Sequence, residues 1–156
     1  MSEGNMREGS GHREGSGDKV YSGAPGDTLL FENDRVRVWS MTLEPGQAVD
    51  YHQHHHDHVV LWPDAGQAQA NELGSEEWGL VQNAEPGFVL YRTVGHTAPL
   101  TPHRIRNVGS NTVTHYIIEL LETSPSAEAH PWVSNGRGVF GALEDVKAEV
   151  KEGAAG

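Results

Sequence analysis

The chain contains no cysteine. Disulfides, zinc–thiolate sites, iron–sulfur clusters and cysteine nucleophiles are therefore excluded, and any metal ion must bind histidine, carboxylate or backbone oxygen. Because disulfides are rare in the cytosol, their absence is compatible with a cytoplasmic protein, and we expect this location.

Basic residues are also scarce, with 11 Lys and Arg against 22 Asp and Glu and a formal net charge of −11. A surface of this charge repels phosphate backbones and anionic lipids, so we expect neither nucleic acid nor a membrane as a partner. No apolar run approaches the roughly 20 residues of a membrane-spanning helix, and we expect no secretory signal because the N-terminus lacks an apolar segment. The expected partner is a small-molecule substrate.

Apolar residues make up only 36% of the 156 residues, and the shortage lies at the two ends of the chain. Residues 1–19 contain the unit Arg-Glu-Gly-Ser-Gly twice, at 7–11 and at 13–17. Such a segment buries too little apolar surface to offset chain entropy, so we expect a disordered tail. The length suits one domain, which we place at residues 20–122.

The central region has the pattern of an all-β domain. Alternating residues over 36–41, the short apolar run 59–62, and the segments 88–91 and 112–121 each predict a strand. Turn signals, including two Glu-Pro-Gly sequences, lie between them. Short strands with turn signals about every 8–12 residues are typical of a β-sandwich or β-barrel.

The last part of the chain, 123–156, is predicted to be a C-terminal extension. Its first residues, 123–136, are rich in Ser, Pro, Ala, Asn and Gly and predict a linker. Apolar residues spaced i, i+3 and i+7 from Leu143 to Val150, with charges between them, predict one short helix at about 142–152.

Histidine is abundant, and five of the ten histidines fall within residues 52–58. His52 and His54 are two residues apart, so on a strand both side chains project from the same face and can reach one ion. His56 and His58 continue this alternation if the strand is unbroken. A metal ion needs three or four converging ligands, so this local pair requires a ligand from another strand.

His103 is the best candidate for that ligand. It lies between a turn-rich loop and the turn before the predicted strand 112–121. In an antiparallel barrel such a residue can face the pair across the interior. His58 is a further candidate, either as a fourth ligand or as a group that hydrogen-bonds a ligand or substrate.

Two sequence motifs resemble those of the cupin superfamily. The first cupin motif is a Gly, five residues, His, one residue, His, three or four residues and Glu, with a later Gly. This chain has Gly46, His52 and His54 at those spacings, a histidine, His58, at the Glu position, and Gly66 near the place of the last glycine.

The second cupin motif ends in His, three residues and Asn, which His103 and Asn107 match. Its front half resembles residues 87–95, with Thr at the position where the family usually has Pro. Seven residues instead of two separate this half from His103, so we interpret 96–102 as a loop with an insertion beside the site.

The resemblance covers about residues 27–122 and implies a double-stranded β-helix, the jelly-roll barrel of cupins, here followed by a short C-terminal helix. It implies a homodimer, as in many cupins of this size. It also implies one divalent metal ion bound by His52, His54 and His103, with His58 as the candidate fourth ligand. Fe(II) is favoured, and Mn, Ni, Cu and Zn are compatible with the same residues.

Three residues are candidates for catalysis. His58 would act as a general base if it is not a ligand. Arg37 lies on the same face of the predicted strand as Met41. If that face lines the interior, Arg37 would clamp a substrate carboxylate; otherwise it lies in solvent. Tyr91 is a candidate pocket residue, with a place in the core or on the barrel surface as the alternative.

Together these features predict a metal-dependent cupin enzyme acting on a small, anionic organic substrate by a dioxygenase-type, lyase or isomerase reaction. Two other functions stay open. One is a non-catalytic small-molecule-binding cupin, and the other is a metal-free isomerase or dehydratase in which histidines act as acid and base. The fold does not choose among them, because one fold supports many chemistries.

Overall fold

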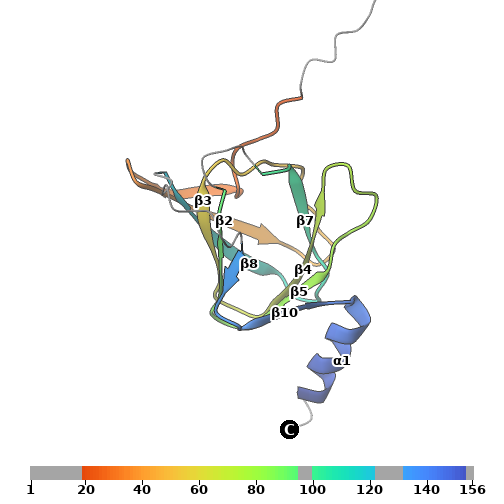
Figure 1. The fold of residues 1–156 in the computed structure, drawn as a ribbon. Coiled ribbons are helices and arrows are strands. Elements are labelled where there is room, and N and C mark those ends of the chain that lie inside the picture. The colour runs from red at the N-terminus through yellow and green to blue at the C-terminus, as the bar shows by residue number, and fades with distance from the viewer. Residues whose placement is uncertain (1–18, 95–99, 122–131, 154–156) are drawn as a thin grey trace, which may run out of the picture.

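The computed structural model describes residues 19–94, 100–121 and 132–153. These residues form an all-β body with one helix at its end (Figure 1). The elements in chain order are β1 (Thr28–Glu32), β2 (Val36–Leu43), β3 (Asp57–Trp62), β4 (Gly66–Glu72), β5 (Val81–Ala84), β6 (Phe88–Arg92), β7 (His103–Asn107), β8 (Val113–Leu120), β9 (Trp132–Ser134), β10 (Gly138–Gly141) and α1 (Leu143–Gly153).

Two antiparallel sheets form the barrel. One has the strand order β1-β2-β8-β3-β6-β9 and the other the order β10-β5-β4-β7. In Figure 1 the strands β2, β3 and β8 lie opposite β4 and β7, and α1 extends from the lower end of the barrel. The all-β barrel with a C-terminal helix that the sequence predicts is therefore confirmed.

The interior changes from apolar to polar along the barrel. Leu43, Trp62 and Phe88 are almost fully buried and close one end, where β2 ends, β3 ends and β6 begins. At the other end, His58 near the start of β3 is buried and pairs in register with Arg92 of β6 and with buried Glu119 of β8. Period-two alternation thus places polar side chains inside the barrel at that end.

A turn and a backbone pairing carry the chain from β2 to β3. The first Glu-Pro-Gly sequence turns at Gly46, whose φ of +79° suits glycine, and its N–H donates to the carbonyl of Asn107 at 3.0 Å. The following residues run antiparallel to β7, with Val49 N–H donating to Ile105 O at 2.9 Å. This pairing brings His52 opposite His103.

The C-terminal part differs from its prediction in one respect. The linker predicted at 123–136 is wrong for Trp132–Ser134, because these residues form β9 and pair with β6. The predicted helix is present as α1, where Val146 is buried against the barrel beside β10. Within the described residues, no helix has the length and apolar character needed to span a membrane.

Several predictions fall on residues that the structure does not describe. The predicted disordered tail lies outside the described residues except for Lys19. The same is true of 95–99, within the predicted insertion, and of 122–131, where the predicted linker begins. The assignment of 20–122 as the barrel domain stays a prediction.

Candidate metal centre

His52 and His103 are placed by the backbone pairing between the 46–53 segment and β7. The His52 N–H donates to His103 O and the His103 N–H donates to His52 O, each at 2.9 Å. Paired residues of antiparallel strands project from the same face. Their two Nε2 atoms accordingly lie 3.0 Å apart.

His54 completes a group of three imidazoles. It lies two residues after His52, and its Nε2 is 3.1 Å from Nε2 of His103. The ligand atoms of His52, His54 and His103 all lie within 4.8 Å of one another. His52 and His54 are buried, and His103 is partly exposed. The structure thus brings together the three histidines that the sequence predicts as ligands.

The spacing fits a single ion. Imidazole nitrogens bind first-row metals at about 2.0–2.1 Å, so two ligands at right angles lie about 3.0 Å apart and two tetrahedral ligands about 3.4 Å apart. The Nε2 atom of His103 lies 3.0 Å from that of His52 and 3.1 Å from that of His54, close to the distance for two ligands at right angles. The Nδ1 of His52 lies 3.3 Å from the carbonyl of Asp50, which favours the tautomer whose Nε2 carries a lone pair toward the ion.

Burial keeps these imidazoles neutral. It lowers the pKa of His103 to about 3, with His52 and Arg92 adding repulsion. It also lowers the pKa of His54 and of His52 below the ordinary value. A neutral imidazole is the form that binds a metal ion. The group is therefore ready to bind metal at neutral pH without first losing protons.

His58 lies beside this group but does not join it. Its ring stacks on that of His54, with centroids 4.1 Å apart and planes 13° apart. The alternation that would align it with His52 and His54 is broken, because β3 begins only at Asp57. The Nδ1–H of His58 donates to the carbonyl of His56 at 2.9 Å, and burial lowers its pKa to about 4.

The other two catalytic candidates lie outside the cavity at the metal centre. Arg37 is partly exposed at the outer end of β2, and its guanidinium pairs with Glu32 of β1. The clamp role depends on Arg37 facing the interior, and Met41 is the residue of this strand that lines the cavity. Tyr91 donates its hydroxyl to Oδ2 of Asp57 at 3.0 Å, on the face of β6 opposite Arg92.

Asp57 is the buried carboxylate nearest in sequence to the histidines. It accepts the Tyr91 hydroxyl on Oδ2 and the Val94 N–H on Oδ1, the latter at 2.6 Å. Burial, followed by the bond to Asp57, raises the pKa of Tyr91, so the phenol stays a donor. Asp57 thus fixes the end of β6 in place.

A cavity of about 150 Å³ adjoins the three imidazoles. It contains polar residues that sequence analysis did not select, and its walls also include apolar residues of both sheets. Besides the three histidines, its polar lining consists of His58, which sequence analysis selected, and of Glu72, Gln82, Arg92 and His115, which it did not. Arg92 could have been found from the alternation of Phe88, Leu90 and Arg92 along β6, which puts all three on one face.

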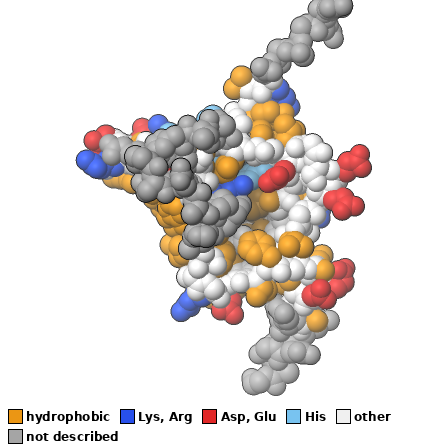
Figure 2. All heavy atoms as spheres, in the orientation of Figure 1, with side chains coloured by type: hydrophobic (Ala, Val, Ile, Leu, Met, Phe, Trp, Pro, Cys, Tyr) orange, Lys and Arg blue, Asp and Glu red, His pale blue; other side chains and the backbone are white. Residues whose placement is uncertain are grey.

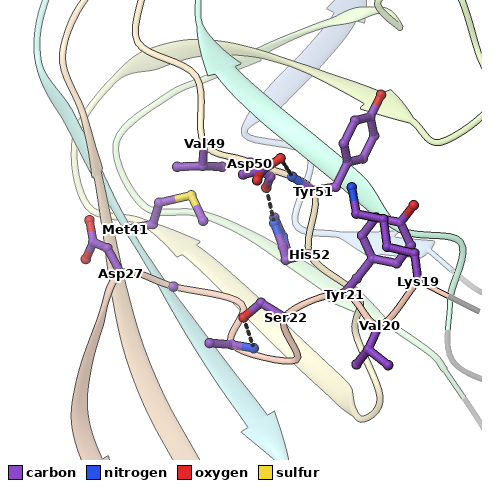
Figure 3. A pocket seen from close by; sticks show the side chains of 12 residues that line it. Lys19, Val20, Tyr21, Ser22, Asp27, Met41, Val49, Asp50, Tyr51 and His52 are labelled. Atoms are coloured by element: carbon purple, nitrogen blue, oxygen red, sulfur yellow. Dashed lines mark hydrogen bonds between the residues drawn. The ribbon is translucent and has the colours of Figure 1, made fainter. Parts of the chain in front are cut away.

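A second pocket, of about 360 Å³, lies on the other side of His52 and Met41, which line both spaces. Figure 3 shows Lys19 and Tyr21 of the N-terminal arm on one side of this pocket and Tyr51 near them. These N-terminal residues pair with the segment that carries two of the three histidines, because the Gln53 N–H donates to Ser22 O at 2.8 Å.

Comparison with known proteins agrees with this architecture. No protein-family model and no curated protein matches the chain. A cupin domain from Bordetella pertussis Tohama I is similar in structure, with a TM-score of 0.50 and 22% identity, over 65% of this chain and 97% of that one. An RmlC-like cupin protein from Desulfovibrio desulfuricans matches at 23% identity and a TM-score of 0.39, over 76% and 96% of the two chains.

The chain has the cupin fold, as its two sequence motifs predicted. The residues of those motifs, His52, His54 and His103, lie at one point inside the barrel. The chain therefore combines the cupin fold with a three-histidine group that could hold a metal ion.

Proposed function

We propose that this cupin is a metal-dependent enzyme acting on a small organic acid. The observation that carries the proposal is the convergence of three Nε2 atoms, with adjacent pairs 3.0 and 3.1 Å apart. Three neutral ligands leave a bound divalent ion its full charge, and with it the capacity to polarise oxygen atoms of a bound substrate as a Lewis acid. A dioxygenase-type reaction with Fe(II), or a lyase or isomerase reaction, suits such a centre.

The protein residues have separate tasks in this proposal. His52, His54 and His103 would hold the ion, and the adjoining cavity of about 150 Å³ would take the substrate. His58 is the candidate general base: its Nδ1–H is held by the His56 carbonyl, which leaves Nε2 to accept a proton.

Elemental analysis of the purified protein tests the metal site. We expect about one iron, manganese, nickel, copper or zinc per chain in the wild type, and almost none in the His52→Ala/His103→Ala double variant. His55→Ala removes an exposed histidine of the same cluster and is the matched control, which should retain the metal. Equal metal content in all three proteins, or none in any of them after supplementation, contradicts the proposal.

A metal-free isomerase or dehydratase is the second candidate, favoured by His58, a neutral imidazole that lines the cavity without joining the metal group. Turnover of candidate small acids after complete removal of metal by a chelator would support this alternative. Loss of turnover on chelation, restored by one metal ion per chain, would support the metal-dependent reaction.

A further inference from the structure

Two polar side chains lie among the apolar residues of the cavity wall. His115 is on the inward face of β8, between Val113 and Ile117 of the apolar core. Gln82 is on β5, on the same face as Ala84, another core residue. Both side chains line the cavity at the metal centre. Since β8 and β5 belong to different sheets, two polar groups from the two sheets border one space.

These two side chains lack the hydrogen bonds that buried polar groups normally make. The Nε2 of Gln82 and the Nδ1 of His115 are buried, and neither has a hydrogen-bond partner among the described residues. His115 is only 4% exposed, and its ring stacks on Trp62 with centroids 4.9 Å apart. Burying a polar group without a partner costs free energy, and such groups are rare in folded proteins. A molecule in the cavity that supplies the missing partners would explain why this cost is tolerated.

The chemistry of the two side chains indicates what such a molecule contains. Burial lowers the pKa of His115 to about 4, so at neutral pH its imidazole is uncharged, with one nitrogen that donates and one that accepts. The Nε2 of Gln82 carries two N–H donors. A carbonyl oxygen accepts hydrogen bonds from such donors, and a hydroxyl can both accept and donate. The pair therefore suits a neutral oxygen atom, whereas a carboxylate suits a divalent ion at the three histidines.

The charged side of the cavity wall reaches solvent, and the side with His115 does not. Figure 2 shows a histidine side chain near the middle of one face, close to a basic and an acidic side chain. The cavity wall contains the same three kinds of side chain, with His103 as a partly exposed imidazole and Glu72 as an exposed carboxylate. Trp62, on which His115 stacks, instead belongs to the buried apolar core. The cavity thus has a charged outer side and an apolar inner side that contains unpartnered polar groups.

We propose that Gln82 and His115 bind a neutral carbonyl or hydroxyl oxygen of the substrate, whose carboxylate reaches the three-histidine group. The inference rests on the proposed function and names its substrate class, a small oxo or hydroxy acid. The cavity volume of about 150 Å³ is below the roughly 300–1,000 Å³ of pockets for drug-sized ligands, so the acid has few carbon atoms. Apolar side chains of the same wall, among them Val60 and Ile117, would contact its carbon chain.

Calorimetric titration of Co(II)-loaded protein with 4-oxopentanoate, 4-hydroxypentanoate and pentanoate tests this inference, because pentanoate lacks the second oxygen. We expect at least one oxygenated acid to bind the wild type about tenfold more tightly than pentanoate, which leaves the buried groups unpaired. Gln82→Met and His115→Phe should each reduce this preference to about threefold or less, without weakening pentanoate binding. Gln67→Met is the matched control and should keep the preference, because Gln67 of β4 lines a different pocket.

Urea unfolding of the ligand-free proteins separates this role from a structural one. Gln82→Met and His115→Phe remove unpartnered polar groups, so both variants should be at least as stable as the wild type at pH 7, whereas loss of a structural residue would destabilise the protein. Equal affinity of the wild type for the three acids, or a preference that both variants keep, overturns the inference. If the wild type binds no Co(II), the proposed metal function fails, and titration of metal-free protein decides on Gln82 and His115: a preference lost in the variants supports their role, and no preference overturns it.

Discussion

Tyr91 illustrates how a residue with catalytic potential can instead hold the site together. Its hydroxyl donates to Asp57, which also accepts the N–H of Val94 beyond the end of β6. Both contacts lie outside the cavity at the metal centre. These contacts give the phenol a stabilising role at the end of β6.

Tyr91→Phe removes one hydrogen bond to a carboxylate and leaves the ring in place. We expect the free energy of unfolding to fall by about 1 kcal/mol, toward the low end for a charged acceptor because Tyr91 is partly exposed. The metal content should stay at the wild-type value. Urea unfolding and elemental analysis check both expectations, and loss of metal at unchanged stability would contradict them.

His115 is a buried titratable group on the wall of the cavity beside the three histidines. Burial lowers its pKa to about 4, with repulsion from His52 adding to the effect. Because the ordinary value is 6.5, the unfolded chain takes up a proton near that pH and the folded protein does not until about pH 4. Its contribution to stability is therefore complete above pH 6.5 and is lost as the pH falls toward 4.

His115→Phe should make the stability of chelator-treated protein less dependent on pH. We expect the free energy of unfolding to fall less between pH 6.5 and 4 than in the wild type, by up to roughly 3 kcal/mol. The phenyl ring keeps the stacking on Trp62. Urea unfolding at several pH values measures the difference, and parallel curves for the two proteins would show that His115 does not titrate in this way.

At the scale of elements, Asn107 connects three parts of the barrel. Its side chain donates to Leu43 O at 3.0 Å and to Asn111 O at 2.7 Å, and it accepts the Gly109 N–H at 2.8 Å. It is fully buried, so these backbone groups have no access to water if the side chain is removed. Asn107, the last residue of the second motif, thus joins the end of β2 to the turn before β8.

Asn107→Ala should destabilise the protein by about 3 kcal/mol, at roughly 1 kcal/mol for each of the three buried hydrogen bonds. Asn111→Ala is the matched control, because Asn111 contributes its backbone carbonyl to this network and its side chain is exposed. Urea unfolding compares the two variants. Similar losses of stability in both variants would contradict the stabilising role of the Asn107 side chain.

Much of the element structure could be predicted from local pattern. Alternation and apolar runs gave β2, β3, β6 and β8, and the Glu-Pro-Gly sequences mark turns with a positive φ at glycine. β9 was missed because it has only three residues and pairs with a strand far away in the sequence. Its hydrogen bonds depend on the tertiary structure, which local pattern does not report.

The site was predictable only in part. The three histidines of the candidate metal site could be selected because spacing and motif agreed, although His52 and His54 are held by pairing with β7 and not by a long regular strand. Arg92 was missed because a charged residue contradicts the usual apolar inward face of a strand. Arg37 was selected because alternation predicts on which face of a strand a side chain lies. Alternation does not predict how much of the strand borders the barrel interior, and in β2 the fully buried positions begin at Met41.

At the scale of the whole molecule, β1 is an edge strand of the six-stranded sheet within the part of the chain that the structure describes. All five of its residues are exposed, including Leu29, Leu30 and Phe31. An exposed apolar edge strand is a template for pairing with another chain, and a strand can pair with its own copy about a two-fold axis. We expect the predicted homodimer to form at this edge.

Phe31→Lys should shift the protein from dimer to monomer, because a charge at the paired edge opposes its copy. Phe140→Lys is the matched control, since both phenylalanines are 53% exposed and Phe140 lies on β10 of the other sheet. Light scattering after size-exclusion chromatography measures the mass. A monomeric wild type, or dissociation by the β10 variant alone, would contradict this expectation.

The central claim is that His52, His54 and His103 bind one metal ion, and anomalous diffraction from a crystal of the metal-loaded protein tests it most directly. We predict one anomalous peak per chain, about 2.0–2.2 Å from the Nε2 atom of each of the three histidines. A peak on the exposed His55 or on His58 without the trio, or no peak at all between the three imidazoles, would contradict the account.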